Sequence, residues 1–366
     1  SGAPFTYFFD DQEAPFKSNA HFSRWCPIEG PHHVLVISPG EKALLVRFAP
    51  EDYWYEPSEL GDPFWLSEFD LVEAETLEDV WKAVGSIRNG AYIGNEPLLA
   101  KQAGIIENPK DLIDRLDWGR AYKTDYELEC LKQANELAAT GHRAAYSVFE
   151  SGGSEFDIHC AFVHELGVVE EDLPYPTIIA LDEKAAFLHY HKKRKVRDGQ
   201  VLLIDAGAER FGYASDITRT LVSLDCDTRF VALQKQMNIL QQDICELVKP
   251  GVTFGELHEN AHFLLAVLLK ENELLKVEPE ESINQGLTRA FFPHGLGHHL
   301  GLQVHDVGGQ LADSVGTLAR PPVRHPYLRN TRTIEARHVF TVEPGLYFIK
   351  MLLRPFRDNA LRNCFN

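Results

Sequence analysis

The sequence predicts an α+β protein of two domains, a smaller mixed α/β domain followed by a larger one. Two observations support this expectation. A chain of 366 residues is long enough for two ordinary domains with a large buried core. Its pattern also changes near residue 119, where short apolar runs give way to long stretches of helical periodicity. We therefore expect the domains to span 1–119 and 120–366.

The first domain is expected to contain short strands and a helix. Apolar runs between turn residues predict strands, and four such runs occur: Val34–Ser38, Lys42–Phe48, Phe69–Glu75 and Ala91–Gly94. The first two are separated by Pro39-Gly40-Glu41, which favours a hairpin. Thr76 comes three residues before Asp79, and this spacing predicts the start of a short helix.

The second domain is expected to begin with two helices. Thr124 and Glu127 form a capping box, in which each side chain satisfies a free backbone N–H at a helix start. Apolar residues then recur at helical spacing until Ser151-Gly152-Gly153 interrupts the pattern. Ser154 with Asp157 predicts the start of the second helix.

Extended segments, two further helices and a glycine-rich region are expected next. Four apolar runs predict strands: Thr177–Leu181, Ala186–Tyr190, Val201–Ile204 and Ala214–Val222. Arg229–Val248 and Phe254–Glu271 predict helices, with Pro250-Gly251 between them. The remainder is rich in glycine, proline and histidine, and Val339–Ile349 predicts a final apolar strand.

Composition and charge exclude several classes of function. The net charge is −18, so phosphate backbones and anionic lipid surfaces would repel the protein. No apolar run is long enough to cross a bilayer. The six cysteines form no CxxC pair, which indicates reduced core thiols and disfavours a structural zinc site. We expect a cytoplasmic protein without a nucleic-acid or membrane partner.

Two aspartates are the first candidates for a functional site. Asp205 ends an apolar run, and Asp216 follows the turn at Phe211-Gly212. If the flanking strands pair as a tight hairpin, the two carboxylates lie nearly opposite each other, about 5 Å apart. Such a pair needs a shared proton or a cation, and divalent manganese, magnesium or zinc suits oxygen ligands. The alternative is a pair of solvent-facing aspartates at a turn.

Histidines are concentrated in a second segment, 291–306. His294, His298, His299 and His305 fall within twelve positions and are interspersed with glycines. Neutral imidazole binds metals and transfers protons near neutral pH. Glycine also lets the backbone approach a ligand closely. The alternative is a glycine-rich loop with ordinary surface histidines.

Glu343 is the candidate in a third segment. It follows the apolar residues Phe340–Val342 and precedes Pro344-Gly345. A charged residue in apolar surroundings needs a partner. Either a metal supplies this partner or an arginine does, and Arg329 and Arg332 are available for an ion pair.

Together the three segments resemble the pita-bread metallopeptidases, which include prolidase, aminopeptidase P and methionine aminopeptidase. The run HGLGHHLGLQVHDVGG (294–309) is specific enough to exclude methionine aminopeptidase. Other segments are similar to bacterial prolidase and to its relative organophosphorus acid anhydrolase: FFDDQEAPFKSNAHF (8–22), RAYKTDYELECL (120–131), GHRAA (141–145), PYPTIIAL (174–181), LHY (188–190), YLRNTR (327–332) and FTVEPGLYFI (340–349). The resemblance covers nearly the whole chain.

This resemblance implies an N-terminal mixed α/β domain and a C-terminal pita-bread domain of the creatinase/aminopeptidase type. It also implies a homodimer and two divalent metal ions, usually manganese. By position, Asp205 resembles a ligand of one metal and Asp216 a ligand that bridges both. His298 and Glu343 resemble ligands of the other metal.

The resemblance also implies roles for residues around the metals. His294 and His305 resemble histidines that contact the substrate and handle protons, and Glu343 would act as the general base. Asp11 resembles a residue that reaches the site of the neighbouring subunit, where it helps confine the amino end of a dipeptide. Further substrate-binding candidates are Tyr175, Leu188, His189, Val304 and Leu328.

The expected reaction is hydrolysis of Xaa-Pro dipeptides by a hydroxide that bridges the two metals. Because a prolyl bond has no N–H, the pocket must recognise the ring shape and the free carboxylate. Leu328, Phe291 and Phe292 are candidate apolar walls, although packing accounts equally well for the two phenylalanines. Cleavage of P–F or P–O bonds in organophosphates would be a side activity of the same hydroxide.

One part of the family pattern does not occur in the sequence. The family has a fifth ligand, a second bridging glutamate, in a GGIRIED-like segment that also carries an arginine for the substrate carboxylate. Neither is found before Asn366, and the sequence begins inside a family motif. We therefore expect the sequence to be incomplete at both ends.

Two other functions fit parts of the pattern. Aminopeptidase P, which removes one residue from longer Xaa-Pro peptides, shares the histidine motif. The segment YLRNTR (327–332) and the region of Asp10-Asp11 favour the dipeptidase. A non-catalytic pita-bread module that binds protein partners is expected to lack the ligand carboxylates, whereas four ligand positions are present here.

Overall fold

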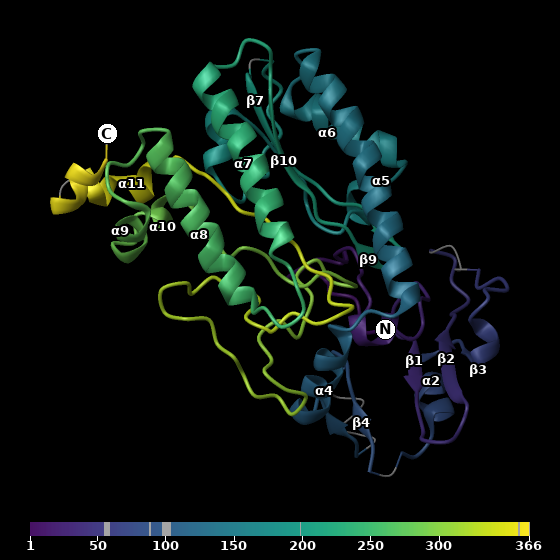
Figure 1. The fold of residues 1–366 in the computed structure, drawn as a ribbon. Coiled ribbons are helices and arrows are strands. Elements are labelled where there is room, and N and C mark those ends of the chain that lie inside the picture. Colours follow the sequence, from purple (N-terminus) through teal and green to yellow (C-terminus); the bar gives the residue numbers. More distant parts are fainter. Residues whose placement is uncertain (55–58, 88, 97–103, 198, 358, 366) are drawn as a thin grey trace. The chain divides into compact units, whose positions relative to one another are not determined.

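The computed structural model describes residues 1–366 except 55–58, 88, 97–103, 198, 358 and 366. The chain divides into two compact units, Ser1–Leu116 and Asp117–Asn366 (Figure 1). Each unit contains hydrophobic clusters of its own. Among the described residues, no helix is both long and apolar enough to cross a membrane.

The first unit is built on a three-stranded sheet with the order β1-β2-β3. β1 (Val34–Val36) pairs antiparallel with β2 (Ala43–Phe48), which confirms the predicted hairpin. β3 (Phe69–Ala74) joins β2 in parallel. α2 (Leu77–Val84) begins at the predicted cap, where the Thr76 side chain accepts the backbone N–H of Asp79 at 3.1 Å.

Short elements complete the first unit. They are α1 (Ala20–Ser23), the 3-10 helix η1 (Leu66–Glu68), β4 (Ala91–Tyr92), β5 (Ile106–Glu107) and the start of α4 (Lys110–Arg120). β4 and β5 pair in parallel, and β4 lies in the predicted strand 91–94. The beginning of the chain turns back on itself, since Thr6 and Glu13 form an isolated antiparallel bridge.

Two long helices open the second unit, and both begin at predicted capping boxes. α5 (Asp125–Glu150) is capped by Thr124, and α6 (Glu155–Leu166) is capped by Ser154. Gly141 lets the two helices pack closely, because a Cβ there would collide with the side chains of Phe162 and Leu166. The pair packs through buried residues such as Phe149 and Phe162 onto the strands that follow.

The central sheet of the second unit has the order β10-β7-β6, and its strands are antiparallel. These strands are β6 (Ile178–Leu181), β7 (Val201–Asp205) and β10 (Thr218–Val222). Between β7 and β10 lies a small hairpin of β8 (Glu209–Arg210) and β9 (Tyr213–Ala214). The sheet lies between α5 and α6 on one side and α7 (Thr228–Glu246) and α8 (Phe254–Glu271) on the other (Figure 1).

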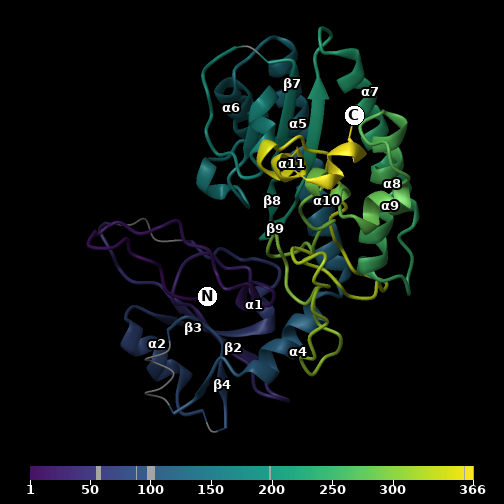
Figure 2. The same cartoon turned by 90° about the vertical axis from the view of Figure 1, so that its left-hand side faces the viewer.

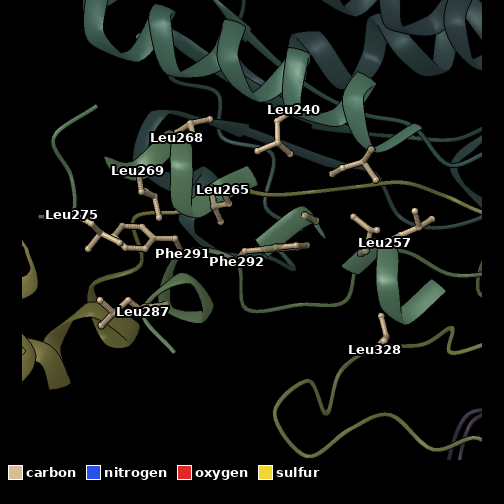
Figure 3. Close-up of a cluster of buried hydrophobic side chains, with 14 of the residues drawn as sticks. Leu240, Leu257, Leu265, Leu268, Leu269, Leu275, Leu287, Phe291, Phe292 and Leu328 are labelled. Atoms are coloured by element: carbon tan, nitrogen blue, oxygen red, sulfur yellow. The ribbon is translucent and has the colours of Figure 1, made fainter. Parts of the chain in front are cut away.

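The largest hydrophobic cluster surrounds α8 and holds the C-terminal part of the chain (Figure 3). Leu257, Leu265 and Leu269 of α8 lie with Phe291 and Phe292 in this cluster, and all five are almost completely buried. Short helices pack at the C-terminal end of α8 (Figure 2): α9 (Pro279–Asn284), α10 (Thr288–Phe291), α11 (Lys350–Arg357) and the 3-10 helix η4 (Ala360–Cys364). This packing fixes the segment that enters the histidine-rich loop.

Two predicted strands are wrong. Instead of a strand over Ala186–Tyr190, the chain forms the 3-10 helix η3 (Asp182–Ala186) and then a turn, with Tyr190 directed to a distant partner, Glu155. The segment Val339–Ile349 is also not a strand. It pairs with the histidine-rich loop at single positions, as in the isolated bridge between His299 and Phe340.

Candidate metal centre

Asp205 and Asp216 come together at the end of the central sheet, although not as a directly opposed pair. The tight hairpin forms around Phe211-Gly212, but its register places Asp205 opposite Thr218, so Asp216 is offset by two residues from the position opposite Asp205. The register runs without interruption from the turn, since Arg210 pairs with Tyr213 and the backbone N–H of Ser215 donates to the Ala208 carbonyl at 2.8 Å. Asp216 lies in the short segment between β9 and β10, two residues before Thr218.

A tyrosine hydroxyl lies between the two carboxylates. The Tyr175 hydroxyl is 2.7 Å from Oδ1 of Asp205 and 3.1 Å from Oδ1 of Asp216. A phenol has a single proton, so it can donate to only one carboxylate at a time. The contact fixes the positions of both oxygens without neutralising the charge of the pair.

His298 joins Asp216 to Glu343. Its Nε2 lies 3.2 Å from Oδ2 of Asp216 and 3.2 Å from Oε1 of Glu343. Its Nδ1 is 2.9 Å from the carbonyl oxygen of His299. Because a carbonyl can only accept, Nδ1 carries the proton, and the lone pair of Nε2 points at the carboxylates in the neutral ring. Metal-binding histidines are commonly oriented by this kind of hydrogen bond.

Thr341 holds Glu343 beside His298. Its hydroxyl lies 2.7 Å from Oε1 of Glu343 and also accepts the backbone N–H of His298 at 3.0 Å. Backbone hydrogen bonds from Thr341 to His298 (2.9 Å) and from Glu343 to Leu296 (2.8 Å) align the two segments. Gly297 allows this approach, since a Cβ there would collide with the Thr341 carbonyl.

The raised pKa values in this cluster indicate that its negative charges are not fully compensated by the protein. Burial, and then repulsion from Asp216, raise the pKa of Asp205 to about 7. Burial alone would lower the pKa of His298, but hydrogen bonds to Asp216 and Glu343 raise it to about 10. Among the described residues, no lysine or arginine forms an ion pair with any of the three carboxylates.

The donor atoms fit a divalent cation. One ligand atom each from Asp216, His298 and Glu343 lies within 4.8 Å of the others, and Asp205 is linked to this group through Tyr175. Carboxylate oxygens with one imidazole suit manganese, zinc or iron, and a cation would relieve the repulsion that burial creates. The alternative of an ion pair between Glu343 and Arg332 does not hold, because Arg332 stacks over the Trp118 ring, 3.3 Å from its centroid.

His294 lies beside Glu343 in a defined tautomer. Its Nδ1 is 2.9 Å from the Gly295 carbonyl oxygen, which can only accept, so Nδ1 carries the proton. Its Nε2 therefore accepts from the Tyr347 hydroxyl, 3.1 Å away. Burial lowers the pKa of His294, which keeps the ring neutral.

His305 packs against the metal-binding face from the same loop. Its ring centroid is 4.4 Å from that of His298, and the rings are nearly perpendicular. Desolvation, and then the charge of His298, lower the pKa of His305 to about 4. The neighbouring Asp306 anchors this part of the loop, because it forms a buried ion pair with Lys123 at 2.7 Å and another with Arg120.

The other predicted substrate-binding residues have different surroundings. Leu188 and His189 lie in the exposed turn after η3, where the His189 ring stacks on His191. Val304 packs against the cluster of Leu300 and Tyr213. Leu328 is 1% exposed and belongs to the core around α8, together with Phe291 and Phe292, so packing accounts for all three. Asp11 is an exposed residue of the first unit.

The sequence interpretation missed two residues of this centre. Thr341 positions Glu343, and Tyr347 fixes the tautomer of His294. Both lie in the segment FTVEPGLYFI (340–349), where the sequence pattern predicts a role for Glu343 alone. Their spacing, two residues before and four after Glu343, is the signal that could have indicated them.

Comparisons with known proteins identify the family of the chain. A family model described as Metallopeptidase family M24 matches residues 129–359, and one described as Xaa-Pro dipeptidase, N-terminal domain matches residues 1–118. The Xaa-Pro dipeptidase of Pseudoalteromonas atlantica is 41% identical over 100% of this chain and 84% of its own length. That of Shewanella woodyi is 42% identical with the same coverage.

Solved structures show the same fold. Aminopeptidase P from Escherichia coli in its low-pH form has a TM-score of 0.77 at 24% identity, covering 99% of this chain and 84% of its own. Aminopeptidase PepP from Pseudomonas aeruginosa has a TM-score of 0.76 at 22% identity with the same coverage. The predicted α+β architecture with a pita-bread domain is thus confirmed. The resemblance read from the sequence motifs is confirmed as well, and the chain belongs to metallopeptidase family M24, which uses divalent metal ions.

Proposed function

We propose that this protein hydrolyses Xaa-Pro dipeptides with the help of two divalent metal ions. Manganese is the first choice for these ions, and Asp205, Asp216, His298 and Glu343 would bind them. One observation carries the proposal. The carboxylates of Asp216 and Glu343 converge on Nε2 of His298, and Tyr175 joins Asp205 to them, with no lysine or arginine paired to the three carboxylates among the described residues. The relatives named Xaa-Pro dipeptidase, at 41–42% identity over the whole chain, support the choice of substrate.

Bound divalent ions would supply a hydroxide near neutral pH and polarise the peptide carbonyl. The protein's own groups handle the protons. Glu343, held by Thr341 at 2.7 Å, takes the proton of the attacking water and passes it to the prolyl nitrogen, which leaves as an amine. His305, adjacent to His298, donates a hydrogen bond to the oxyanion that forms at the carbonyl.

The neutral state of His294 suits a substrate-contacting role. The Gly295 carbonyl holds its Nδ1 proton, and the Tyr347 hydroxyl donates to its Nε2. An imidazole fixed in this way presents a rigid face beside Glu343, where a proline ring can pack. A prolyl peptide bond offers no N–H, so shape and the terminal carboxylate are the features left to recognise.

The homodimer implied by the family has support in the first unit. Phe8 and Phe9, at the turn next to Asp11, are 87% and 95% exposed. Exposed aromatic rings of this size are typical of surfaces that another chain covers. We propose that a second copy covers this turn and that Asp11 then helps to confine the amino end of the dipeptide. Sedimentation of the wild-type chain and of Phe8→Ser/Phe9→Ser tests this, and an unchanged mass would contradict it.

Hydrolysis of Leu-Pro and of Leu-Pro-Gly tests the main proposal. Chelator-treated protein is assayed for release of proline from Leu-Pro and of leucine from Leu-Pro-Gly, with and without manganese. Manganese-dependent cleavage of Leu-Pro alone supports the dipeptidase. Cleavage of the tripeptide would instead indicate an aminopeptidase P. No turnover of either peptide with any divalent metal would leave the non-catalytic module as the better account.

Organophosphate hydrolysis is a finer part of the proposal. The hydroxide that attacks a planar carbonyl can also attack a tetrahedral phosphorus, because both reactions place negative charge on an oxygen next to the cations. Fluoride release from a P–F substrate measures it. A rate that falls in parallel with Leu-Pro hydrolysis in Asp216→Asn would assign both reactions to one site, and an unchanged rate would separate them.

A further inference from the structure

A second cluster of histidines lies beside α8, and the proposed reaction does not use it. His258 and His262 are one helical turn apart on α8, and His325 comes from the loop 320–331. One ring nitrogen from each lies within 4.8 Å of those of the other two. We propose that these three histidines bind a divalent transition-metal ion such as zinc, at a site separate from the catalytic centre.

The cluster is buried and contains polar atoms without partners. His258 and His262 are each 1% exposed, and their ring centroids are 4.6 Å apart. Nδ1 of His258 and Nε2 of His262 are buried and have no hydrogen-bond partner. Such atoms are uncommon in folded proteins because each loses its hydration without compensation. A metal ion bound to these rings would satisfy them.

Outer partners orient two of the rings. Nδ1 of His262 is 3.0 Å from the Thr288 hydroxyl, which leaves Nε2 for a ligand. Nε2 of His325 is 3.0 Å from a carboxylate oxygen of Glu259. An ionised carboxylate can only accept, so Nε2 of His325 carries a proton and Nδ1 is the ligand atom. A carboxylate that holds a histidine in this way is a recurrent feature of zinc sites.

The rings are in the protonation state that a metal requires. Burial, and then the neighbouring imidazoles, lower the pKa of His258 to about 2 and that of His262 to about 3. Burial also lowers the pKa of His325. All three are therefore neutral near pH 7, and a neutral imidazole can bind a cation without first releasing a proton.

An ion can reach this position. A pocket of about 360 Å³ opens beside the cluster and is lined by His258, Glu259 and His325, among others. Zinc–nitrogen bonds are about 2.0–2.1 Å long, so three nitrogens spread evenly around one ion lie ~3.3–3.6 Å from one another. Small rotations of the rings would bring the observed nitrogens into this range.

The donor set selects the metal. Three imidazole nitrogens suit zinc, copper or nickel, whereas manganese and magnesium prefer carboxylate oxygens. The catalytic cluster contains three carboxylates and one imidazole, so the two sites differ in preference. The spacing of the cysteines gives no indication of this site, because none of the ligands is a cysteine and the third is distant in sequence from the other two.

Zinc stoichiometry tests the proposal. Chelator-treated full-length wild-type protein, His325→Gln and His164→Gln are dialysed against buffered zinc, and bound zinc is counted. His164 lies on the exposed side of α6 and serves as the matched control. We expect His325→Gln to bind one zinc ion fewer than the wild type and His164→Gln to bind the same number. Equal zinc binding by His325→Gln and the wild type would overturn the proposal.

A second variant guards against a folding defect. The Glu259 side chain is one-third exposed, so Glu259→Gln is expected to fold. Loss of an outer partner typically weakens metal binding by about 10–100-fold, and we expect this range for the zinc that His325→Gln loses. Unchanged affinity of Glu259→Gln at that site would count against the proposed arrangement.

Electron paramagnetic resonance of copper-loaded protein gives a readout that peptidase activity does not affect. Each imidazole nitrogen splits the copper signal. The histidine cluster supplies three nitrogens, whereas His298 supplies one to the catalytic cluster. A three-nitrogen signal that His325→Gln loses supports the proposal, and a signal from one nitrogen alone overturns it. Because both tests compare variants of this cluster, a failure of the Xaa-Pro dipeptidase proposal would leave their outcome unchanged.

Discussion

The negative charges of two acidic sites in the second unit, Asp306 and the cluster around Asp205, are compensated in different ways. Asp306 is buried between Lys123 and Arg120, with the Lys123 ammonium 2.7 Å away. Burial opposes ionisation there, but Lys123 and then Arg120 hold the pKa of Asp306 below its usual value. Asp205 has no such cation in the part of the chain that the structure describes, and burial together with Asp216 raises its pKa to about 7.

This difference separates a structural charge from one that is available to a ligand. Where an ionised carboxylate has to hold a loop in place, the chain itself supplies the compensating cations. Around Asp205, Asp216 and Glu343, no lysine or arginine is paired among the described residues, so the compensating charge has to come from a proton on His298 or from a metal. The predictions that follow test this contrast, starting with the largest expected effect.

Removing one carboxylate from the uncompensated cluster is expected to have the largest effect. Asp216→Asn should lower kcat/KM for Leu-Pro by at least ~10³-fold, because metal-assisted catalysis is worth several kcal/mol. The metal content should fall as well. Both are measured on the same preparation, by proline release and by elemental analysis.

Asp225 provides the matched control for this substitution. It is an exposed turn residue of the same unit, so Asp225→Asn makes the same chemical change away from the cluster. Its activity is expected to match the wild type. If Asp216→Asn kept full activity and metal content, Asp216 could not be a ligand, and the contrast with Asp306 would lose its meaning.

Removing the compensated carboxylate should instead reduce stability. Asp306→Asn leaves Lys123 and Arg120 buried beside a neutral amide, and breaking a buried ion pair in this way costs about 3–5 kcal/mol. Urea unfolding of metal-free protein measures the difference. Metal-free Asp216→Asn is expected to lose much less stability, since the charge that it removes repels Asp205 as well as pairing with His298, and a loss as large as that of Asp306→Asn would contradict the comparison.

The stabilising effect of Asp306 should depend on pH. Its pKa is lowered in the folded state, so the unfolded chain takes up a proton first as the pH falls. The stabilisation is therefore complete above about pH 4, the unfolded value, and is lost as the pH falls through the folded pKa. The difference between wild type and Asp306→Asn should shrink over this window, and a constant difference would argue against an ionic origin.

Local signals in the sequence were sufficient for much of the fold. The capping boxes at Thr124 and Ser154 involve only neighbouring residues, and both helices begin where these residues predict. The prediction of a strand over Ala186–Tyr190 was wrong. Tyr190 is buried where its hydroxyl donates to Glu155, and no local pattern contains this contact. Apolar runs indicate burial, but they do not reveal which partner provides it.

The candidate site was predictable as a set of residue types but not as a geometry. Carboxylates after apolar runs indicated that a cation is needed, yet the pairing of Asp205 with Thr218 depends on the register that the turn at Phe211-Gly212 sets. The roles of Thr341 and Tyr347 depend on atoms that meet only after two loops pack together. The histidine cluster beside α8 needs His325 from a distant loop, so its composition alone gave no signal.

A smaller effect is expected from removing a hydrogen bond that positions Glu343 while every charge of the cluster is kept. Thr341→Val deletes the hydroxyl that lies 2.7 Å from Glu343 and accepts the backbone N–H of His298. Loss of such an outer partner typically weakens metal affinity by about 10–100-fold. Thr341→Ser keeps the hydroxyl and serves as the control. Competition with a chelator measures both affinities, and equal weakening in the two variants would point to lost packing of the methyl group.

The smallest effect is expected from a change that affects only the orientation of the His294 ring. Tyr347→Phe removes the hydroxyl that donates to Nε2 of His294 but leaves all carboxylates and their charges unchanged. A neutral hydrogen bond contributes about 0.5–1.5 kcal/mol, so kcat/KM for Leu-Pro should fall by roughly 2–10-fold while the metal content stays the same. His294→Ala should lose more, and adding Tyr347→Phe to it should have no further effect, because the hydroxyl acts through that ring. An additive loss in the double variant would show that Tyr347 acts on another partner. Glu343 is the first candidate, because its charge acts on the Tyr347 hydroxyl and helps to raise its pKa.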